Sequence, residues 1–164
     1  MFKKTTLAFL MIIALATQAF GGEELYKKLQ EISVTVKSGF SEGSGVIITR
    51  EVKTEEHKTE KINFVWTAGH VIDNLRSVRS VIENGQPKKI VEFKDAQIVK
   101  ELVENGRRVG ELKMDAKVIK YSDADDGEDL ALLMVRKRSF IDNNAVFYSG
   151  AGKPVAIGTE LYHV

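Results

Sequence analysis

Short runs in which apolar and polar residues alternate cover most of the chain, and this is the period of a β-strand with one buried face. Only Glu23–Gln30 and Val71–Leu75 are typical of helical turns. The pattern therefore favours an all-β fold with little helix. The predicted strands are Ile32–Lys37, Val46–Arg50, Ile62–Thr67, Ile90–Leu102, Val109–Tyr121 and Leu130–Val135, with the start of a further strand over Pro154–Val164.

Turn-forming residues separate these strands. Gly39–Gly45 contains three glycines and two serines and predicts a break between the first two strands. Glu51–Lys61 is charged throughout and is expected to be a loop or a long hairpin tip, and Glu83–Pro87 is a turn cluster. Asn105-Gly106 is a strong hairpin signal. Short antiparallel strands with turns at regular spacing indicate a barrel or a sandwich.

The N-terminal residues have the composition of a secretory signal. Two lysines at the start are followed by an apolar run over Leu7–Ala16 and by small residues up to Gly22. The apolar run is too short for the roughly 20 residues of a membrane helix. We expect a signal peptide over residues 1–21, cleaved after Ala19 or Gly21, and an exported protein, periplasmic or secreted, without a stable membrane span. The alternative is a buried N-terminal helix.

Composition narrows the function classes. The chain has 164 residues, 43% of them hydrophobic, and 24 Lys and Arg against 23 Asp and Glu, so one globular domain with a hydrophobic core is expected. A net charge of +1 argues against nucleic acid as the main partner, because phosphate binding needs a basic excess. The absence of cysteine excludes disulfides, cysteine–zinc sites, iron–sulfur clusters and thiol nucleophiles. We expect neither a cofactor nor a metal.

The three histidines form a short list of candidates for acid–base chemistry. His70 follows an apolar strand and the small-residue turn Thr67-Ala68-Gly69, where a general base would be fixed and still reach a substrate. The alternative is a histidine that only caps the strand end. His57 lies in the charged loop and is expected to be solvated, and no partner can be named for His163.

Asp129 precedes the fully apolar strand Leu130–Val135, which is expected to be buried on both faces, and is itself expected to be partly buried. A buried carboxylate that accepts a histidine N–H fixes the tautomer of the ring and stabilises its charged form. The neighbouring acidic residues Asp123, Asp125 and Asp126 are expected to be solvated. A calcium loop starting at Asp123 is disfavoured, because the positions of the central glycine and of the closing glutamate do not match.

Three motifs, in this order, resemble those of trypsin-like serine proteases of the bacterial, disulfide-free type. They are Gly43-Ser44-Gly45-Val46-Ile47-Ile48, Thr67-Ala68-Gly69-His70-Val71-Ile72 and Asp129-Leu130-Ala131-Leu132-Leu133. The separation of 59 residues between His70 and Asp129 also suits this family. The resemblance covers Ser33 to Arg136.

The resemblance implies a fold of two six-stranded antiparallel Greek-key barrels with the active site between them. By motif, His70 matches the general base and Asp129 the orienting carboxylate of an endopeptidase acting on a protein or peptide substrate. Residues 22–150 would be the first barrel, and residues 151–164 a linker and the first strand of a second barrel that the chain does not continue.

The family's nucleophile lies in a glycine-(Asp/Asn)-serine-glycine-glycine turn of the second barrel, and this sequence has no such turn. Ser139 and Ser149 are the only serines after Asp129, and neither matches. The expected protein is therefore the N-terminal part of a serine endopeptidase, inactive by itself. The alternatives are a non-catalytic exported barrel that serves as a binding module, or a split enzyme whose second barrel is another polypeptide.

The pattern G-x-S-x-G at Gly39–Gly43 is a separate candidate for a nucleophile elbow. Such an elbow needs a helix after the serine, whereas a β run follows here. Ser41 and Ser44 are therefore expected to be turn residues at the start of the second strand.

Overall fold

The structure is a computed structural model that describes residues 22–53, 58–123, 125, 127–148, 150, 152 and 154–162. The signal peptide expected over residues 1–21, His57 and His163 lie outside the described residues. A helix over residues 22–32 precedes the first strand. The strands are β1 (Ser33–Ser38), β2 (Ser41–Lys53), β3 (Thr59–Ala68), β4 (Arg76–Glu83), β5 (Gln86–Phe93), β6 (Ala96–Glu104), β7 (Arg107–Tyr121) and β8 (Leu130–Val135).

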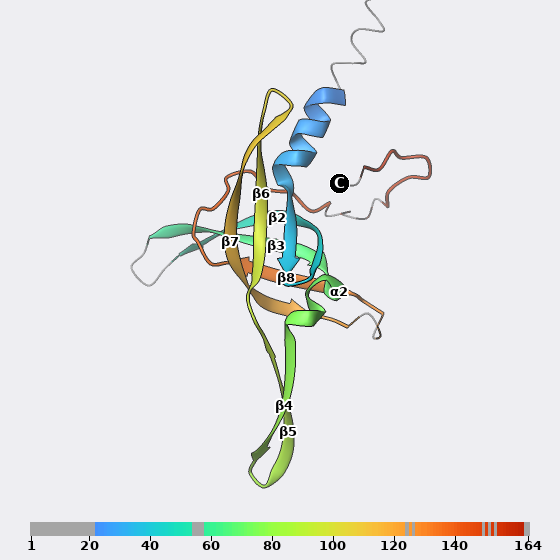
Figure 1. Ribbon diagram of the computed structural model, residues 1–164. Coiled ribbons are helices and arrows are strands. Elements are labelled where there is room, and N and C mark those ends of the chain that lie inside the picture. Colours follow the sequence, from blue (N-terminus) through green and yellow to red (C-terminus); the bar gives the residue numbers. More distant parts are fainter. Residues whose placement is uncertain are drawn as a thin grey trace, which may run out of the picture.

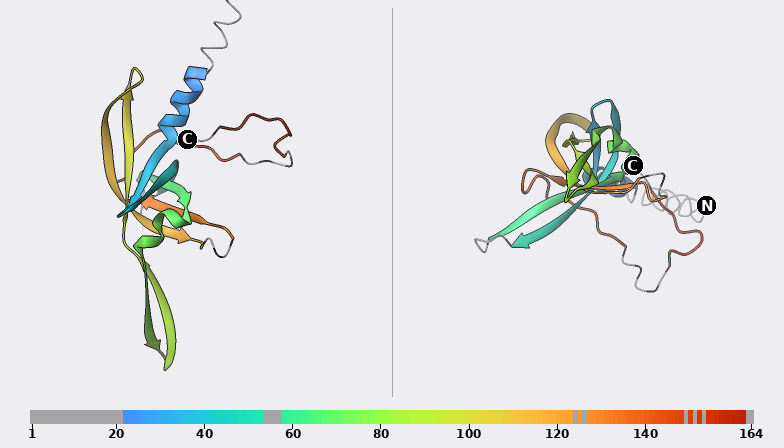
Figure 2. Two further views of the ribbon diagram at one scale, coloured as in Figure 1. Left: turned by 45° about the vertical axis from the view of Figure 1, so that its right-hand side comes forward. Right: turned by 90° about the horizontal axis from the view of Figure 1, so that it is seen from below.

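Six of these strands close into a barrel in the order β1-β2-β3-β8-β7-β6, and all neighbouring pairs are antiparallel (Figure 1). The barrel closes where β6 pairs with β1, with Val36 opposite Ile98. The expectation of a mostly β, antiparallel, six-stranded barrel is confirmed. β4 and β5 pair only with each other and project from the barrel (Figures 1 and 2).

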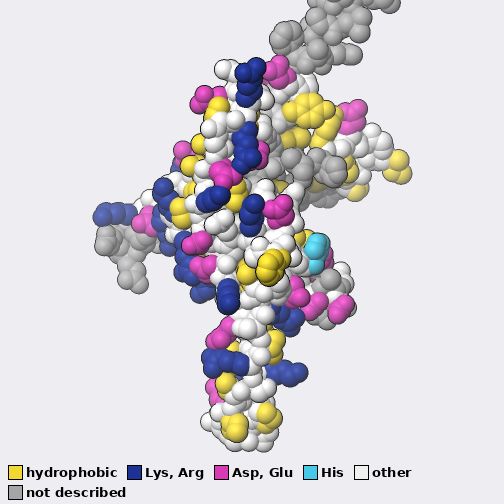
Figure 3. Space-filling model, viewed as in Figure 1, with side chains coloured by type: hydrophobic (Ala, Val, Ile, Leu, Met, Phe, Trp, Pro, Cys, Tyr) yellow, Lys and Arg dark blue, Asp and Glu magenta, His cyan; other side chains and the backbone are white. Residues whose placement is uncertain are grey.

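Inward-facing residues of the barrel strands, mostly at alternate positions, form the core. Val36, Ile47, Val65, Ile98 and Leu133 are completely buried. The opposite faces of the strands carry interspersed acidic and basic side chains on the side visible in Figure 3. The core therefore follows from the alternation that the sequence shows.

The strand β8 was expected to be buried on both faces, and this is wrong. Ala131, Leu133 and Val135 are buried, whereas Leu130 is exposed and the residues between them are half-buried. A closed barrel has one interior, so the outward face of β8 is covered only where other segments cross it.

The predicted break over Gly39–Gly45 is also wrong. Only Gly39 and Phe40 form the turn, and β2 runs without interruption from Ser41, so Ser41 starts the strand while Ser44 lies inside it. A Cβ on Gly43 would stand 2.5 Å from the side chain of Val71. This glycine therefore permits close packing of β2 against the short helix after β3, and does not mark a turn.

Two other predicted strands differ from the structure. Ile90–Leu102 is divided at Lys94 and Asp95 into β5 and β6, because the chain passes there from the projecting hairpin into the barrel. The Asp95 carboxylate binds Arg136 at this junction, at 2.6 and 2.8 Å. Residues 154–162 contain no strand, since no barrel strand is left for them to pair with.

The hairpin predictions agree with the structure. Asn105-Gly106 connects β6 to β7 with positive φ at both residues, 49° and 71°. The two described ends of the charged segment Glu51–Lys61 belong to a long hairpin, since β2 and β3 stay paired as far as Lys53 opposite Thr59. Asn84-Gly85 joins β4 to β5 in the same two-residue manner.

A buried lysine attaches the helix at residues 22–32 to the barrel. Lys100, in β6, is 8% exposed, and its ammonium group donates hydrogen bonds to the carbonyl oxygens of Gln30 and Ser33, the latter at 3.0 Å. Burial lowers the pKa of Lys100. Carbonyls at the end of a helix have no partner within the helix, so a cation placed there stabilises it. Among the described residues, no helix is both long enough and apolar enough to cross a bilayer.

A buried asparagine attaches the segment after β8 to β2 and β3. Asn63 is fully buried, and its amide donates to Thr49 Oγ1 and to the Ile141 carbonyl, both at 2.9 Å. Its Oδ1 accepts the N–H groups of Phe140 and Ile141 at 2.9 and 3.1 Å. All four hydrogen-bonding positions of the amide are thus used, and they fix the direction in which the chain leaves β8.

Candidate functional site

The site lies at the end of the barrel where β3 ends and β8 begins. These strands are antiparallel neighbours and Ala68 pairs with Leu130, so the residues just beyond these two positions must meet. They are His70, in the short helix α2 (Gly69–Ile72), and Asp129, the residue before β8. The structure therefore brings together the two residues that sequence analysis singled out.

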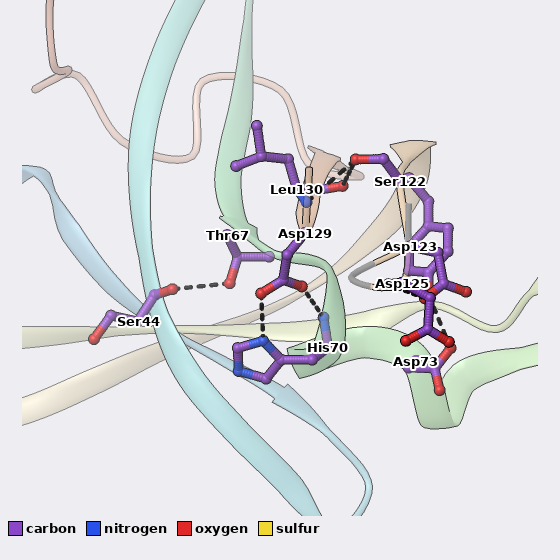
Figure 4. Close-up of polar contacts among 10 residues, drawn as sticks. Ser44, Thr67, His70, Asp73, Ser122, Asp123, Asp125, Asp129 and Leu130 are labelled. Atoms are coloured by element: carbon purple, nitrogen blue, oxygen red, sulfur yellow. Dashed lines mark hydrogen bonds and ion pairs between the residues drawn. The ribbon is translucent and has the colours of Figure 1, made fainter. Parts of the chain in front are cut away.

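Asp129 contacts His70 through both carboxylate oxygens (Figure 4). Its Oδ2 lies 2.7 Å from the ring nitrogen Nδ1, and its Oδ1 accepts the backbone N–H of His70 at 2.8 Å. The Gly69 N–H donates to the backbone carbonyl of Asp129 at 3.0 Å. The three contacts fix both the ring and the backbone of His70 relative to the carboxylate.

Two further hydrogen bonds hold the loop that precedes β8. The N–H of Ser122 donates to the Leu130 carbonyl at 2.8 Å, and the Leu130 N–H donates to the Ser122 hydroxyl at 3.3 Å. Asp129 itself has a left-handed backbone with φ of 42°. Aspartate is one of the few residues besides glycine that adopt this conformation readily. The loop therefore turns sharply and directs the carboxylate at His70.

The electrostatics keep this carboxylate ionised. The hydrogen bond from the His70 ring, followed by the one from the His70 backbone N–H, lowers the pKa of Asp129. The Asp129 side chain is 34% exposed, whereas that of His70 is 68% exposed. Within the described part of the chain, no hydrogen bond to Nε2 of His70 is present. With Nδ1 bound to an acceptor, Nε2 is the nitrogen that can take a proton from an incoming group.

A second polar cluster lies beside the site, and sequence analysis missed it. The Tyr121 hydroxyl donates to Asp73 Oδ1 at 3.0 Å, and Arg76 binds Asp123 at 3.0 Å while lying 5.4 Å from the centre of the Tyr121 ring. Burial and the Asp73 carboxylate raise the pKa of Tyr121 to about 12. The sequence only weakly indicates this cluster, since neither an isolated tyrosine nor a charged loop identifies the distant residues that it contacts.

The acidic loop is only in part as expected. Asp123 is not merely solvated, because it binds Arg76 and accepts the backbone N–H of Asp125 at 3.2 Å. Asp125 is exposed, as predicted, and Asp126 lies outside the described residues. In the described ranges no group of three or more histidine or acidic side chains could hold a metal ion.

The serines do not complete a catalytic triad within the described part of the chain. Ser139 donates its backbone N–H to the Lys61 carbonyl at 3.0 Å, near the end of β3 opposite to His70. Ser149 lies outside the described residues. Ser44 is close to the site, but the contact it provides is its carbonyl oxygen, which accepts the Thr67 hydroxyl at 2.8 Å (Figure 4). Of the described serine hydroxyl groups, none hydrogen-bonds His70.

Apolar side chains are exposed on the same side of the barrel as His70. Phe40, in the turn between β1 and β2, is fully exposed, and Leu130, next to Asp129, is 49% exposed. The turn is held against the histidine segment by hydrogen bonds from the Asn74 amide to the Ser38 carbonyl and from the Ser38 hydroxyl to the Val71 carbonyl. Exposed apolar groups beside an acid–base pair are suited to contact with a substrate or with another domain.

The site can therefore accept a proton at His70 and stabilise the resulting charge through Asp129. In the described residues it contains no attacking atom placed against His70. Comparisons of the chain with protein-family models, with curated proteins and with solved structures give no match.

Proposed function

We propose that this chain carries the general base and the orienting carboxylate of a serine-type endopeptidase of the trypsin-like kind, with His70 as the base and Asp129 as the carboxylate. The observation that carries the proposal is the contact of Asp129 with both the ring and the backbone of His70. A carboxylate that only capped the strand would not need to reach Nδ1. One that also binds Nδ1 sets the tautomer, which is what a general base requires.

In this mechanism Nε2 of His70 removes the proton from a serine hydroxyl as the oxygen attacks the carbonyl carbon of a peptide bond. Asp129 stabilises the imidazolium that forms. The same ring then gives the proton to the leaving amine, which breaks the peptide bond and leaves an acyl-enzyme for water to hydrolyse. The serine and the donors for the oxyanion would come from a second barrel, outside residues 22–150.

The arrangement of the strands supports this assignment. Around the barrel β6, β1, β2 and β3 are neighbours in this order, so the fourth barrel strand in the sequence lies beside the first. This order supports the proposal of a Greek key, the topology expected for the first barrel of a trypsin-like protease. The exposed Phe40 and Leu130 beside the pair support a surface covered by a second barrel.

The proposed place of action is outside the cytoplasm, on the basis of the signal-like composition of residues 1–21. Mass spectrometry of the protein from its natural cells should give a mature N-terminus after Ala19 or Gly21. An intact N-terminus in the cytoplasmic fraction would contradict this part of the proposal.

The test uses recombinant forms of the whole polypeptide that the gene encodes, assayed for hydrolysis of a fluorescently quenched protein substrate and for labelling by a fluorophosphonate. We expect His70→Ala and Asp129→Asn each to lower the rate by about 10⁴-fold. Asp125→Asn is the matched control, because this carboxylate lies in the same loop and is exposed. It should leave the rate unchanged. A rate equally insensitive to all three variants would overturn the proposal.

A second candidate is a non-catalytic barrel that binds polypeptides. It is favoured by one observation, that no hydroxyl group of the described serines contacts His70. In that case the whole encoded polypeptide, alone and with its cellular partners, would neither hydrolyse the substrate nor react with the fluorophosphonate. Labelling that appears only with an added second polypeptide would instead identify a split enzyme.

A further inference from the structure

The hairpin of β4 and β5, residues Arg76–Phe93, projects from the barrel as an arm that pairs with no other strand (Figures 1 and 2). An isolated two-stranded sheet is marginally stable in water. Its chain enters directly from the 3₁₀ turn η1 (Asp73–Leu75), which follows the helix that carries His70. The catalytic proposal gives this arm no role.

The two faces of the arm differ in their acidic side chains and in the exposure of their apolar ones. The register places Val78, Ile82, Pro87 and Val91 on one face, where Ile82 is 82% exposed and Val78 52% exposed. The other face carries the half-buried Val81 and Ile90 and the ion pairs of Arg79 with Glu92 and of Lys88 with Glu83. Both glutamates of the arm are therefore engaged on this second face. Figure 3 shows the apolar side chains at the tip of the arm, with basic side chains along its length.

One cation interrupts the apolar face. Lys89 lies opposite Ser80 in the register, between the pair Val78–Val91 and the pair Ile82–Pro87. Because Ser80 is small, the Lys89 ammonium group can reach across it. The two glutamates of the arm bind Arg79 and Lys88, so no carboxylate within the arm neutralises Lys89. A partner that covers this face should supply one.

The two edges of the arm also differ. In a hairpin closed by a two-residue turn, the residues flanking the turn form a hydrogen-bonded pair, and alternate pairs turn their backbone groups outward. On β4 these outward positions are Val78, Ser80 and Ile82, which have free N–H and C=O groups for another strand. On β5 one outward position is Pro87, which has no N–H and weakens pairing on that edge. The β4 edge is thus the one that can accept a strand.

The base of the arm is held rigidly. The ring of Phe93 lies 5.1 Å from that of Tyr121, and the Lys94 N–H donates to the Leu75 carbonyl at 3.1 Å. Arg76, the first residue of β4, binds Asp123 of the acidic loop. The arm is therefore presented in a defined direction from the barrel, as a docking element requires.

We propose that the arm is a docking site for an extended segment of a partner polypeptide, which adds as a strand to the free edge of β4. Side chains of this segment on one face are apolar and cover Val78 and Ile82, with an acidic side chain beside Ser80 that binds Lys89. Backbone hydrogen bonds along β4 provide affinity, and the alternation of apolar and acidic side chains provides selectivity. This site does not depend on the proposed proteolysis.

Two other occupants fit the arm less well. A membrane would leave the outward backbone groups of β4 without hydrogen-bond partners, which is costly in hydrocarbon. A second copy packed through the same face would bring two Lys89 ammonium groups together without a carboxylate between them. A polypeptide segment with acidic and apolar side chains can both hydrogen-bond the outward backbone groups of β4 and neutralise the Lys89 ammonium group.

The test measures binding of a fluorescent synthetic peptide to the full chain by anisotropy. In the peptide, valine and threonine alternate and one central glutamate replaces a valine. We expect Ser80→Pro, which removes an outward N–H of β4, and the double variant Val78→Thr/Ile82→Thr, which removes the apolar contacts, each to weaken binding about tenfold or more. Lys89→Gln should weaken it severalfold and reduce its dependence on salt.

The matched control is Lys89→Pro, which places a proline on the opposite edge of the same arm. It should bind the peptide as Lys89→Gln does, because both variants lack the cation and the β5 edge is not used. If Ser80→Pro and Lys89→Pro lost the same amount of peptide affinity, strand addition to β4 would be overturned. Binding only to anionic phosphatidylglycerol vesicles, self-association through the arm in sedimentation, or no binding by the parent chain would overturn the proposal altogether. His70→Ala should not change binding, so failure of the proposed proteolysis is distinguishable.

Discussion

Gly69 lies so close to Ser122 that a Cβ on Gly69 would stand 2.5 Å from the Ser122 carbonyl oxygen. The same Cβ would be 3.1 Å from Oδ1 of Asp129. Glycine at this position therefore lets the histidine segment approach the loop that carries the carboxylate. The small residue before His70 is a requirement of the site and not merely of a turn.

We predict that Gly69→Ala destabilises the fold by about 1–3 kcal/mol, because the backbone around Ser122 must move to accept the methyl group. Urea unfolding measures this loss. The displacement should also lengthen the contact between His70 and Asp129, visible as a changed imidazole signal in NMR. Gly110→Ala is a suitable control, since its added Cβ would meet only a side-chain atom at 3.7 Å. An unchanged stability of Gly69→Ala would contradict the close approach.

The His70 tautomer should depend on the charge of Asp129. In the native chain the Nδ1–H tautomer is favoured, because Oδ2 of Asp129 lies 2.7 Å from Nδ1 and accepts its hydrogen bond. In Asp129→Asn an amide N–H can face Nδ1 instead and favours the Nε2–H tautomer. Nitrogen-15 NMR of the neutral ring, recorded at alkaline pH, distinguishes the two forms. The same tautomer in both proteins would show that Asp129 does not orient the ring.

Replacing Asn63 by alanine should release the segment that follows β8. The change leaves two backbone N–H groups and one carbonyl without partners, at a cost of about 3 kcal/mol. Hydrogen exchange at Phe140 and Ile141 should become much faster, while exchange in β8 changes only with overall stability. Thr49→Val, which removes just one partner of the amide, should have a smaller effect. If the Ile141 amide were equally protected from hydrogen exchange in Asn63→Ala and Thr49→Val, the proposed role of Asn63 would be contradicted.

Tyr121 should make stability fall in alkaline solution. Its pKa is raised to about 12 in the folded protein, whereas an unfolded tyrosine titrates near 10. Between these values the folded state retains the proton and the unfolded state releases it, so rising pH favours unfolding. The stabilisation is complete below about pH 10 and is lost as pH rises through the folded pKa.

The measurement compares the native chain with Tyr121→Phe in urea at several pH values from 9 to 12. Their difference in unfolding free energy should favour the native chain at the lower end and shrink towards the upper end. Asp73→Asn removes one cause of the raised pKa, so the decline should be smaller and should end at lower pH. If the difference in unfolding free energy between the native chain and Tyr121→Phe did not depend on pH, the raised pKa of Tyr121 would be refuted.

The all-β class and most barrel strands could be predicted because alternation directly reports a strand with one buried face. Ile62–Thr67 falls within β3, and Leu130–Val135 matches β8. His70 and Asp129 could be picked out individually, as residues next to those two strands. Their contact depends on β3 pairing with β8, a connection between distant segments that alternation alone does not indicate.

What could not be predicted depends on neighbours distant in sequence. Gly43 has the composition of a turn, but its role is close packing against Val71. Lys100 and Asn63 have the character of surface residues, but both are buried, since main-chain groups from other segments satisfy them. The arm was missed because both of its faces are largely exposed, which leaves β4 without the regular alternation of a barrel strand.

The left-handed backbone of Asp129 makes natural variation at this position informative. Its positive φ is tolerated by asparagine and glycine as well, and its carbonyl would still accept the Gly69 N–H after either replacement. Only the contact with Nδ1 requires a carboxylate. If selection acts merely on the shape of the loop, related chains should drift freely among these three residues, whereas selection for proton transfer should retain aspartate alone.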